Sequence, residues 1–172
     1  TVVSVDKDVE ALSFSIVAEF DADVKRVWAI WEDPRQLERW WGPPTWPATF
    51  ETHEFTVGGK AAYYMTGPDG TKARGWWQFT TIEAPDHLEF DDGFADEHGA
   101  PVDELGVTHA TVKLEPLENR TRMTIISTFE SEEQMQKMAE MGMEEGMREA
   151  IEQIDAVLSE PANALEHHHH HH

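Results

Sequence analysis

The sequence predicts an α+β domain in which an antiparallel sheet packs against a long C-terminal helix. Three observations predict this fold. A strand-like alternation at Leu12–Phe20 leads into two helical patterns within Val24–Pro44. Alternating segments joined by turn residues then occupy 48–129, and one amphipathic helical pattern runs from Ser131 to Leu158. Strands followed by helices, rather than alternating with them, favour an α+β architecture with about six or seven strands.

The stretch Val24–Pro44 predicts two short helices in tandem after the first strand. Apolar residues recur at helical spacing in the first, at Val24, Val27, Trp28 and Trp31. Asp33 can cap the second, and Pro34 suits its first position, where a missing N–H costs nothing. Leu37, Trp40 and Trp41 repeat the spacing before Gly42 and two prolines end the helix. Two short helices that carry four tryptophans are predicted to pack these side chains against a core or a cavity wall.

The middle of the chain predicts antiparallel strands and one irregular segment. Alternation or hairpin chemistry places strands at 48–57, 60–66, 71–82, 87–90, 107–117 and 120–129. Gly67-Pro68-Asp69-Gly70 is a typical turn sequence. Asp91–Gly106 is acidic, contains glycine and proline and shows no period, so we expect a long mobile loop there. Its carboxylates lack calcium-loop spacing and are expected to be a solvated charge run, without a metal site.

The C-terminal pattern opens with a capping box at Ser131-Glu132-Glu133-Gln134. Gly142 and Gly146 lie on the apolar stripe of the helix. Each glycine costs about 1 kcal/mol relative to alanine in a helix interior. We therefore expect either a close approach to the sheet or a bend near Gly142 that separates a short helix from a long one.

Composition restricts the domain organisation and the class of partner. Leu165–His172 is a cloning scar and purification tag and is set aside. We expect residues 1–10 to be a loose leader, 11–158 a single domain, and 159–172 a disordered tail. The formal charge is −21, and −20 without the one glutamate of the tag stretch. Such acidity disfavours nucleic acid as a partner. No apolar run is long enough to span a membrane, and a cytoplasmic location is expected.

Established catalytic motifs are absent from the sequence. There is no nucleophile elbow, no phosphate-binding loop and no dinucleotide fingerprint, and the chain has no cysteine. The four histidines outside the tag show no metal-ligand spacing, and His53 and His109 are expected to face solvent from their strands. We therefore predict no catalytic residue, no cofactor and no metal.

Several short motifs resemble one known family. They are Val27-Trp28, Asp33-Pro34, Trp40-Trp41-Gly42-Pro43, Gly58-Gly59-Lys60, Gly67-Pro68-Asp69-Gly70, Ala84-Pro85-Asp86-His87-Leu88, Asn119-Arg120-Thr121 and Gly142-Met143-Glu144-Glu145-Gly146-Met147. Together they resemble the START-like (SRPBCC, helix-grip) superfamily, in the branch of homologues of the activator of the 90-kDa heat-shock protein ATPase. The resemblance covers nearly all of Leu12–Leu158. Family members commonly carry a tryptophan where this chain has Met143.

The resemblance implies a curved antiparallel sheet that grips the long helix, with an apolar cavity between them. Small residues expected to point inward support such a space: Ala61, Gly75, Ala110, Gly142 and Gly146. The predicted cavity residues are Trp28, Trp31, Trp41, Tyr63, Met65, Trp77, Phe79, Phe90, Met143, Met147 and Ile151. Few polar groups could orient a guest: the Tyr63 hydroxyl, indole N–H groups, Gln78, Ser127 and Thr128.

The predicted function is binding of an apolar or aromatic small molecule. Two alternatives stay open. One is a protein-interaction module that acts as a co-chaperone of the 90-kDa heat-shock protein. The other is an enzyme of the cyclase, aromatase or hydrolase kind that uses the same cavity, which would need an acid–base pair facing it. We favour a binding domain over an enzyme, because no such pair is evident in the sequence.

Overall fold

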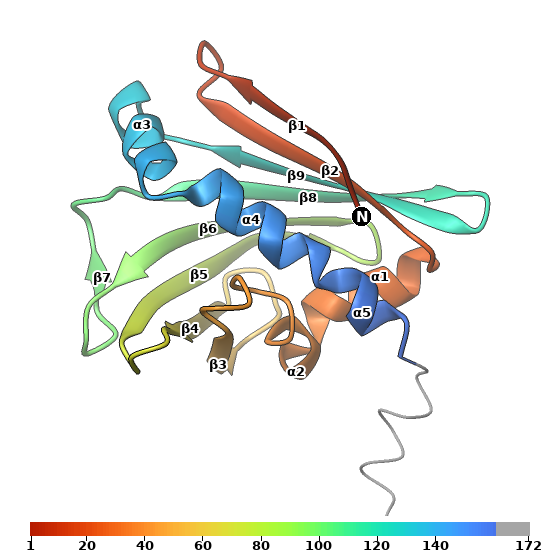
Figure 1. The fold of residues 1–172 in the computed structure, drawn as a ribbon, viewed down its shortest axis with the longest axis horizontal. Coiled ribbons are helices and arrows are strands. Elements are labelled where there is room, and N and C mark those ends of the chain that lie inside the picture. The colour runs from red at the N-terminus through yellow and green to blue at the C-terminus, as the bar shows by residue number, and fades with distance from the viewer. Residues whose placement is uncertain (161–172) are drawn as a thin grey trace, which may run out of the picture.

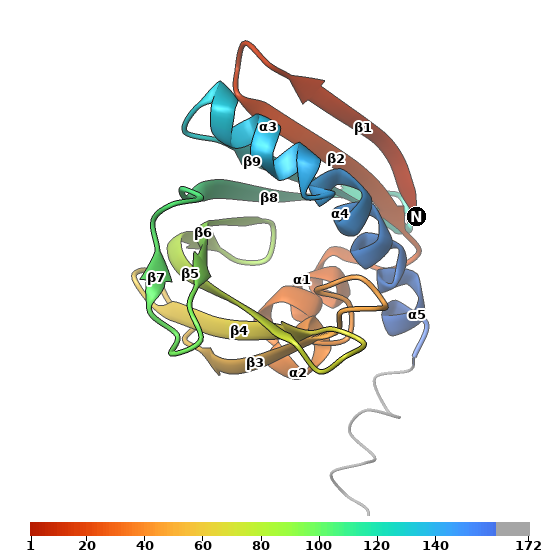
Figure 2. The same cartoon turned by 60° about the vertical axis from the view of Figure 1, so that its left-hand side comes forward.

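The computed structural model describes residues 1–160, in which one curved, nine-stranded antiparallel sheet wraps around a C-terminal helical segment (Figures 1 and 2). The strands are β1 (Val2–Asp8), β2 (Ser13–Phe20), β3 (Ala48–His53), β4 (Lys60–Thr66), β5 (Lys72–Glu83), β6 (His87–Ala95), β7 (Pro101–Val102), β8 (Thr108–Leu117) and β9 (Arg120–Thr128). The helices are α1 (Val24–Glu32), α2 (Pro34–Leu37), α3 (Glu132–Glu140), α4 (Met143–Glu152) and α5 (Ile154–Leu158). The predicted α+β helix-grip fold is confirmed, with more strands than expected.

The sheet order is β1-β2-β9-β8-β6-β5-β4-β3, with short β7 added beside β6. Helices α1 and α2 connect β2 to β3, and α4 runs diagonally across the inner face of the sheet (Figure 1). Turned by 60°, the sheet shows its curvature, and α4 and α5 lie across its open side (Figure 2). The space between this helix and the sheet is where side chains from both layers meet.

The two short helices form where the sequence places their caps. The Asp23 side chain accepts a hydrogen bond from the Arg26 backbone N–H at 2.9 Å and caps α1. Asp33 does the same for α2 through the Arg35 N–H, with Pro34 at the first helical position. Both caps satisfy backbone donors that the helix itself leaves unpaired. The apolar face of α1 is buried, so the tryptophans here face the interior.

The C-terminal helix is divided into three parts, of which α4 covers the sheet. Gly142 adopts φ +81, a left-handed conformation that ends α3 and begins α4. A Cβ at Gly142 would meet nothing within 4 Å, so close approach to the sheet is not why glycine stands there. Of the two expected explanations, the bend is the correct one. Gln153 separates α4 from α5.

The expectation of a loose leader at residues 1–10 is wrong for Val2–Asp8, which form the edge strand β1. Two contacts with the C-terminal helix fix its start. The Val2 backbone N–H donates to Glu152 Oε1 at 2.8 Å, and the Thr1 ammonium pairs with Asp155. β1 was missed because most of its side chains are exposed, which removes the apolar alternation that marks a half-buried strand.

The expectation of a disordered tail at 159–172 is wrong for its first two residues. The Glu160 carboxylate forms an ion pair with Arg39, so residues 159 and 160 belong with the folded unit. The remainder of the predicted tail, including the tag, lies outside the described residues. Among residues 1–160, no helix has the length and apolar character that crossing a membrane requires.

The expectation of a long loop at Asp91–Gly106 is also wrong in part. Strand β6 continues through Asp91 to Ala95, and Pro101–Val102 pairs with it as β7. Gly93 is needed in this strand because Trp76 lies directly opposite it. A Cβ on Gly93 would stand 2.5 Å from the Trp76 ring. Glycine here makes room for an indole, and the acidic residues beside it belong to the sheet.

Candidate ligand cavity

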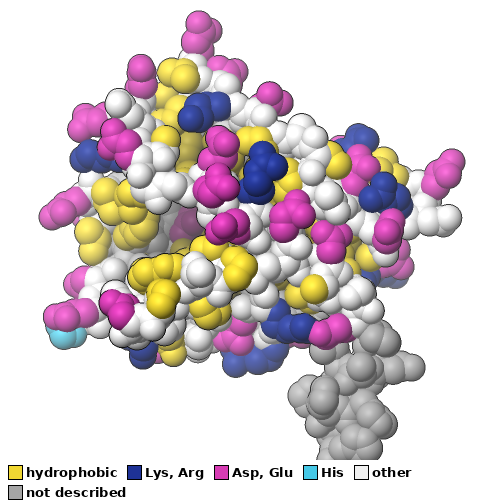
Figure 3. Space-filling model, in the orientation of Figure 1, with side chains coloured by type: hydrophobic (Ala, Val, Ile, Leu, Met, Phe, Trp, Pro, Cys, Tyr) yellow, Lys and Arg dark blue, Asp and Glu magenta, His cyan; other side chains and the backbone are white. Residues whose placement is uncertain are grey.

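A cavity of about 280 Å³ lies between the inner face of the sheet and helix α4. Figure 3 shows a hollow beside this helix with hydrophobic side chains around it and acidic side chains on the surrounding surface. Its floor comes from β4, β6, β8 and β9, and its roof from α3 and α4. Its side wall comes from α1 and the turn after α2. Met141, which is exposed, belongs to its lining at the end of α3.

The structure places seven of the eleven predicted cavity residues on the wall: Trp31, Trp41, Tyr63, Met65, Phe90, Met143 and Met147. Apolar residues that were not singled out complete it, chiefly Pro43, Phe94, Ile125, Met138, Met141 and Ala150. Five of the wall residues are methionines. Methionine is flexible and polarisable, so this wall can adjust to the shape of a guest.

The other four predicted residues, Trp28, Trp77, Phe79 and Ile151, lie in the packed core behind the wall. Trp77 stacks on Phe90 with ring centroids 4.1 Å apart and so supports a wall residue from behind. Ile151 is fully buried. The sequence predicts them as cavity residues because an inward-facing position does not distinguish a side chain packed in the core from one that lines a space.

Two glycines shape the cavity in different ways. A Cβ on Gly75 would lie 2.5 Å from the Tyr63 hydroxyl oxygen, so this glycine leaves room for the phenol ring on the neighbouring strand. A Cβ on Gly146 would meet nothing within 4 Å, although Gly146 belongs to the cavity lining. The absence of a side chain on α4 at this point therefore contributes open volume to the cavity.

Among residues 1–160, one carboxyl group lines the cavity, that of Asp92. It accepts a hydrogen bond from the Tyr63 hydroxyl at 3.2 Å through Oδ1. Asp92 pairs across the sheet with Trp77 on one side and Thr108 on the other, which points its side chain to the inner face. Sequence interpretation missed this residue because it lies within an acidic run. The signal was its position two residues after inward-facing Phe90 in a strand of period two.

Burial raises the pKa of Asp92 from the usual 3.8 to about 7. Removing a carboxylate from water disfavours its charged form. The Tyr63 hydroxyl and the Trp77 indole N–H act in the opposite direction, since donors favour the carboxylate, but they do not outweigh burial. Burial and the neighbouring Asp92 carboxylate raise the pKa of Tyr63 well above its usual value. Both groups therefore hold their protons to a higher pH than the same groups do at the protein surface.

Two hydroxyl side chains also face the cavity. Thr108 and Ser127 are buried, line the wall, and form no side-chain hydrogen bond to any other residue of the described chain. Thr108 stands directly across the strand pair from Asp92, and Ser127 lies across from Ala110. Of the polar groups predicted to orient a guest, Tyr63 and Ser127 reach the cavity. Gln78 and Thr128 are outside its lining.

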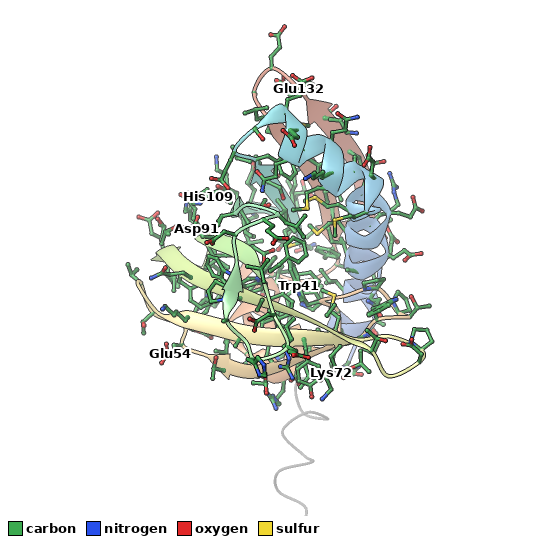
Figure 4. All side chains as sticks on the ribbon, turned by 90° about the vertical axis from the view of Figure 1, so that its left-hand side faces the viewer. Trp41, Glu54, Lys72, Asp91, His109 and Glu132 are labelled. Atoms are coloured by element: carbon green, nitrogen blue, oxygen red, sulfur yellow. The ribbon has the colours of Figure 1, made fainter. Side chains whose placement is uncertain are left out.

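The histidines lie elsewhere and have partners that the sequence did not reveal. Imidazole nitrogens of His109 lie 2.8 Å from a Glu89 oxygen and 2.9 Å from an Asp91 oxygen. Figure 4 shows His109 and Asp91 side by side on the outer side of the sheet, with Trp41 on the inner side. The expectation that His53 faces solvent is wrong: it is half-buried, stacks on Phe55, and donates from Nε2 to the Trp31 carbonyl at 3.1 Å.

Comparison with known protein families matches residues 21–159 to the family described as activator of Hsp90 ATPase homolog 1-like protein. This match spans most of the chain. The chain belongs to this family. The resemblance drawn from the sequence motifs is thereby confirmed, and the fold of this family supports a ligand-binding domain at the level of the family.

Solved structures of similar proteins agree with this membership. Protein Ms6760 from Mycobacterium smegmatis is 43% identical, with a TM-score of 0.87, over 94% of this chain and 99% of that one. A protein from Staphylococcus epidermidis is 27% identical, with a TM-score of 0.80, over 99% and 100% of the two chains. A protein named AHSA1 from Silicibacter pomeroyi is 21% identical (TM-score 0.68, 90% and 99%) and shows the shared fold. A search of curated proteins gave no match.

Proposed function

We propose that this domain binds one small apolar or aromatic molecule in the cavity between α4 and the sheet. The observation that carries the proposal is the cavity itself, whose wall is formed by aromatic and methionine side chains around a few polar groups. Small-molecule sites are typically concave, mostly apolar and provided with a small number of oriented polar groups. The cavity meets this description with Asp92, Tyr63, Thr108 and Ser127 as its polar set.

The volume restricts the size of the guest. Ligand pockets commonly measure about 300–1,000 Å³, and this cavity of about 280 Å³ lies just below that range. A guest of one or two fused rings suits this space better than a long-chain lipid. The aromatic side chains Trp31, Trp41 and Phe90 offer ring faces and edges for such a guest to stack against.

Gly146 allows the proposal to be tested without damage to the fold. Gly146→Leu should fill the cavity, since nothing lies within 4 Å of the added Cβ, and should abolish binding of a naphthalene-sized probe. Gly146→Ala is the matched control, because it removes the glycine but adds only one methyl group. Both variants should melt higher than the original chain, since each replaces a helix-interior glycine.

Binding can be followed by calorimetry and by amide shifts in isotope-labelled protein. The expected shifts are at Trp31, Tyr63, Phe90, Met143 and Met147, which lie far apart in the chain and together on the cavity wall. Equal binding by Gly146→Leu and by the original chain would contradict the proposal. If no apolar probe binds the original chain at millimolar concentration, the co-chaperone alternative would become the better hypothesis.

One observation favours catalysis as a second candidate function. The enzyme alternative required an acid–base pair facing the cavity, and Asp92 with the Tyr63 hydroxyl supplies one. A carboxyl with a pKa of about 7 is suited to accept and return a proton near neutral pH. Solvent deuterium uptake at the carbon next to the carbonyl of a small aromatic ketone would detect such chemistry. Asp92→Asn should abolish the uptake, and equal uptake by this variant would refute the assignment.

A further inference from the structure

When Asp92 is ionised, the cavity holds one negative charge without a balancing cation. Asp92 and Tyr63 are the only ionisable residues in the cavity lining of residues 1–160, and neither lysine, arginine nor histidine belongs to that lining. The elements around Asp92 contribute Tyr63 from β4, Trp77 from β5, Thr108 from β8, and apolar residues from α4. An ionised Asp92 therefore has hydrogen-bond donors as neighbours but no counter-ion.

The Asp92 carboxyl also retains an unused acceptor. Its Oδ1 accepts from the Tyr63 hydroxyl at 3.2 Å, whereas Oδ2 forms no hydrogen bond of ordinary geometry to any residue within 1–160. The Trp77 indole N–H lies near enough to lower the pKa of Asp92, but its geometry leaves it unpaired. The Thr108 hydroxyl, directly opposite on β8, and the Ser127 hydroxyl are likewise unpartnered among these residues, and both side chains are more than nine-tenths buried. These oxygens are accessible from the cavity, where a bound donor can pair with them.

The rest of the wall suits the same kind of guest. Trp31, Trp41, Tyr63 and Phe90 surround the interior with aromatic rings. Aromatic faces carry negative charge density and attract cations. The indole Nε1 atoms of Trp31 and Trp41 are buried beneath the surface, so the cavity meets the rings and not their N–H groups. At a formal charge of −21, the chain as a whole attracts cations and repels anions.

From this arrangement we propose that the ligand is a lipophilic amine, bound with its ammonium group on Asp92 and its aromatic body against the cavity wall. The inference rests on the proposed function, because it specifies the guest of the same cavity. The ammonium donates to the free Asp92 oxygen and to the Thr108 hydroxyl oxygen, while its charge replaces the missing counter-ion. A carboxylate ligand is excluded by the same features, since it would place a second negative charge beside Asp92.

Three probes with the same ring system test this proposal. They are 2-naphthylmethylamine, 2-naphthylmethanol and 2-naphthoate, which differ in the charge of one substituent. At about pH 8 most of Asp92 is ionised. Calorimetric titration at this pH should give the highest affinity for the amine, a lower one for the alcohol and the lowest for the carboxylate. The amine should bind roughly tenfold or more tightly than the alcohol, as a charge-assisted hydrogen bond requires.

Two variants separate the effect of the cavity carboxyl on binding from the effect of the acidic surface. Asp92→Asn keeps the side-chain shape and should remove most of the advantage in affinity that the amine has over the alcohol. Asp91→Asn removes the same charge from the neighbouring residue, which faces His109 on the outer side of the sheet, and should keep the preference. Persistence of the amine preference in Asp92→Asn, or its loss in Asp91→Asn, would refute the role of Asp92.

The possible failures are distinguishable. If the alcohol binds the original chain but the amine binds no better, the cavity is a binding site and the assignment of an amine ligand is wrong. If none of the three probes binds the original chain, the proposed function itself fails, and the amine inference fails with it. If the carboxylate binds most tightly, the cavity accepts anions and the inference is overturned.

Discussion

Replacing the half-buried cavity carboxyl by an amide, Asp92→Asn, should change how stability depends on pH. The folded-state pKa of about 7 lies above the usual 3.8, so the folded chain holds this proton more tightly than the unfolded chain does. The folded state is therefore favoured while Asp92 is protonated and loses that advantage as pH rises from 3.8 through 7. Three pKa units correspond to about 4 kcal/mol at 1.36 kcal/mol each. Asparagine does not ionise, so the variant does not lose this stability as pH rises.

The assay is urea unfolding of both chains across a range of pH. The variant should be more stable than the original at every pH above neutrality, by about 4 kcal/mol at most. Between about pH 5.5 and about pH 8.5 the difference should grow by about 2 kcal/mol, equivalent to about 4–8 °C in melting temperature. The amide oxygen can still accept from Tyr63, so that hydrogen bond is preserved.

Two results would refute this reasoning. A stability difference that is constant across pH would mean that Asp92 titrates at its usual pKa. A difference that shrinks as pH rises would mean that the carboxylate, and not the acid, is favoured in the fold. Asp86→Asn is the control, because it removes an equal charge from an exposed residue outside the cavity and should not reproduce the gain at high pH.

Further expectations concern the bend, the tryptophan pair, the cavity and the outer histidine. Gly142→Ala should destabilise the chain by about 1–2 kcal/mol, because alanine resists the left-handed φ, and a gain in urea unfolding would contradict this. Trp40→Ala should lower the free energy of unfolding by about 3–5 kcal/mol, and Trp41→Ala should lower it less, because Trp41 already borders the cavity. Trp40→Ala should therefore melt at the lower temperature, and a lower melting temperature for Trp41→Ala would disprove the prediction. Met143→Trp should weaken probe binding by filling volume, which calorimetry would measure, and unchanged affinity would count against it. Burial lowers the pKa of His109, but hydrogen bonds with Asp91 and Glu89 raise it, and the pKa lies above the usual 6.5 overall. The protonated ring should therefore stabilise the fold below pH 6.5, and this stabilisation should be lost as pH rises through the raised pKa. An NMR titration of the ring with a midpoint below 6.5 would refute this.

Local patterns in the sequence determined most of the fold. Asp33-Pro34 and Ser131 fixed helix starts because a cap depends on residues within three positions of one another. The position of Gly142 on an apolar helical stripe predicts either a close approach to the sheet or a bend, and the structure has the bend. The motifs around the tryptophan pair indicated the family, and the family match confirmed it. Each of these features depends on residues that lie close together in the chain.

The tertiary structure decided which inward-facing residues pack in the core and which line the cavity. Trp77 and Phe90 both point inward, yet only Phe90 borders the space, because the curvature of the sheet and the position of α4 set the distance between layers. Strand pairing also gave Asp92 its role. Within an acidic run it resembles a solvated charge, but its pairing with Trp77 and Thr108 places it, half-buried, beside Tyr63 on the cavity wall. Which residues face each other across strands distant in the chain depends on sheet register, which no local pattern in one sequence specifies.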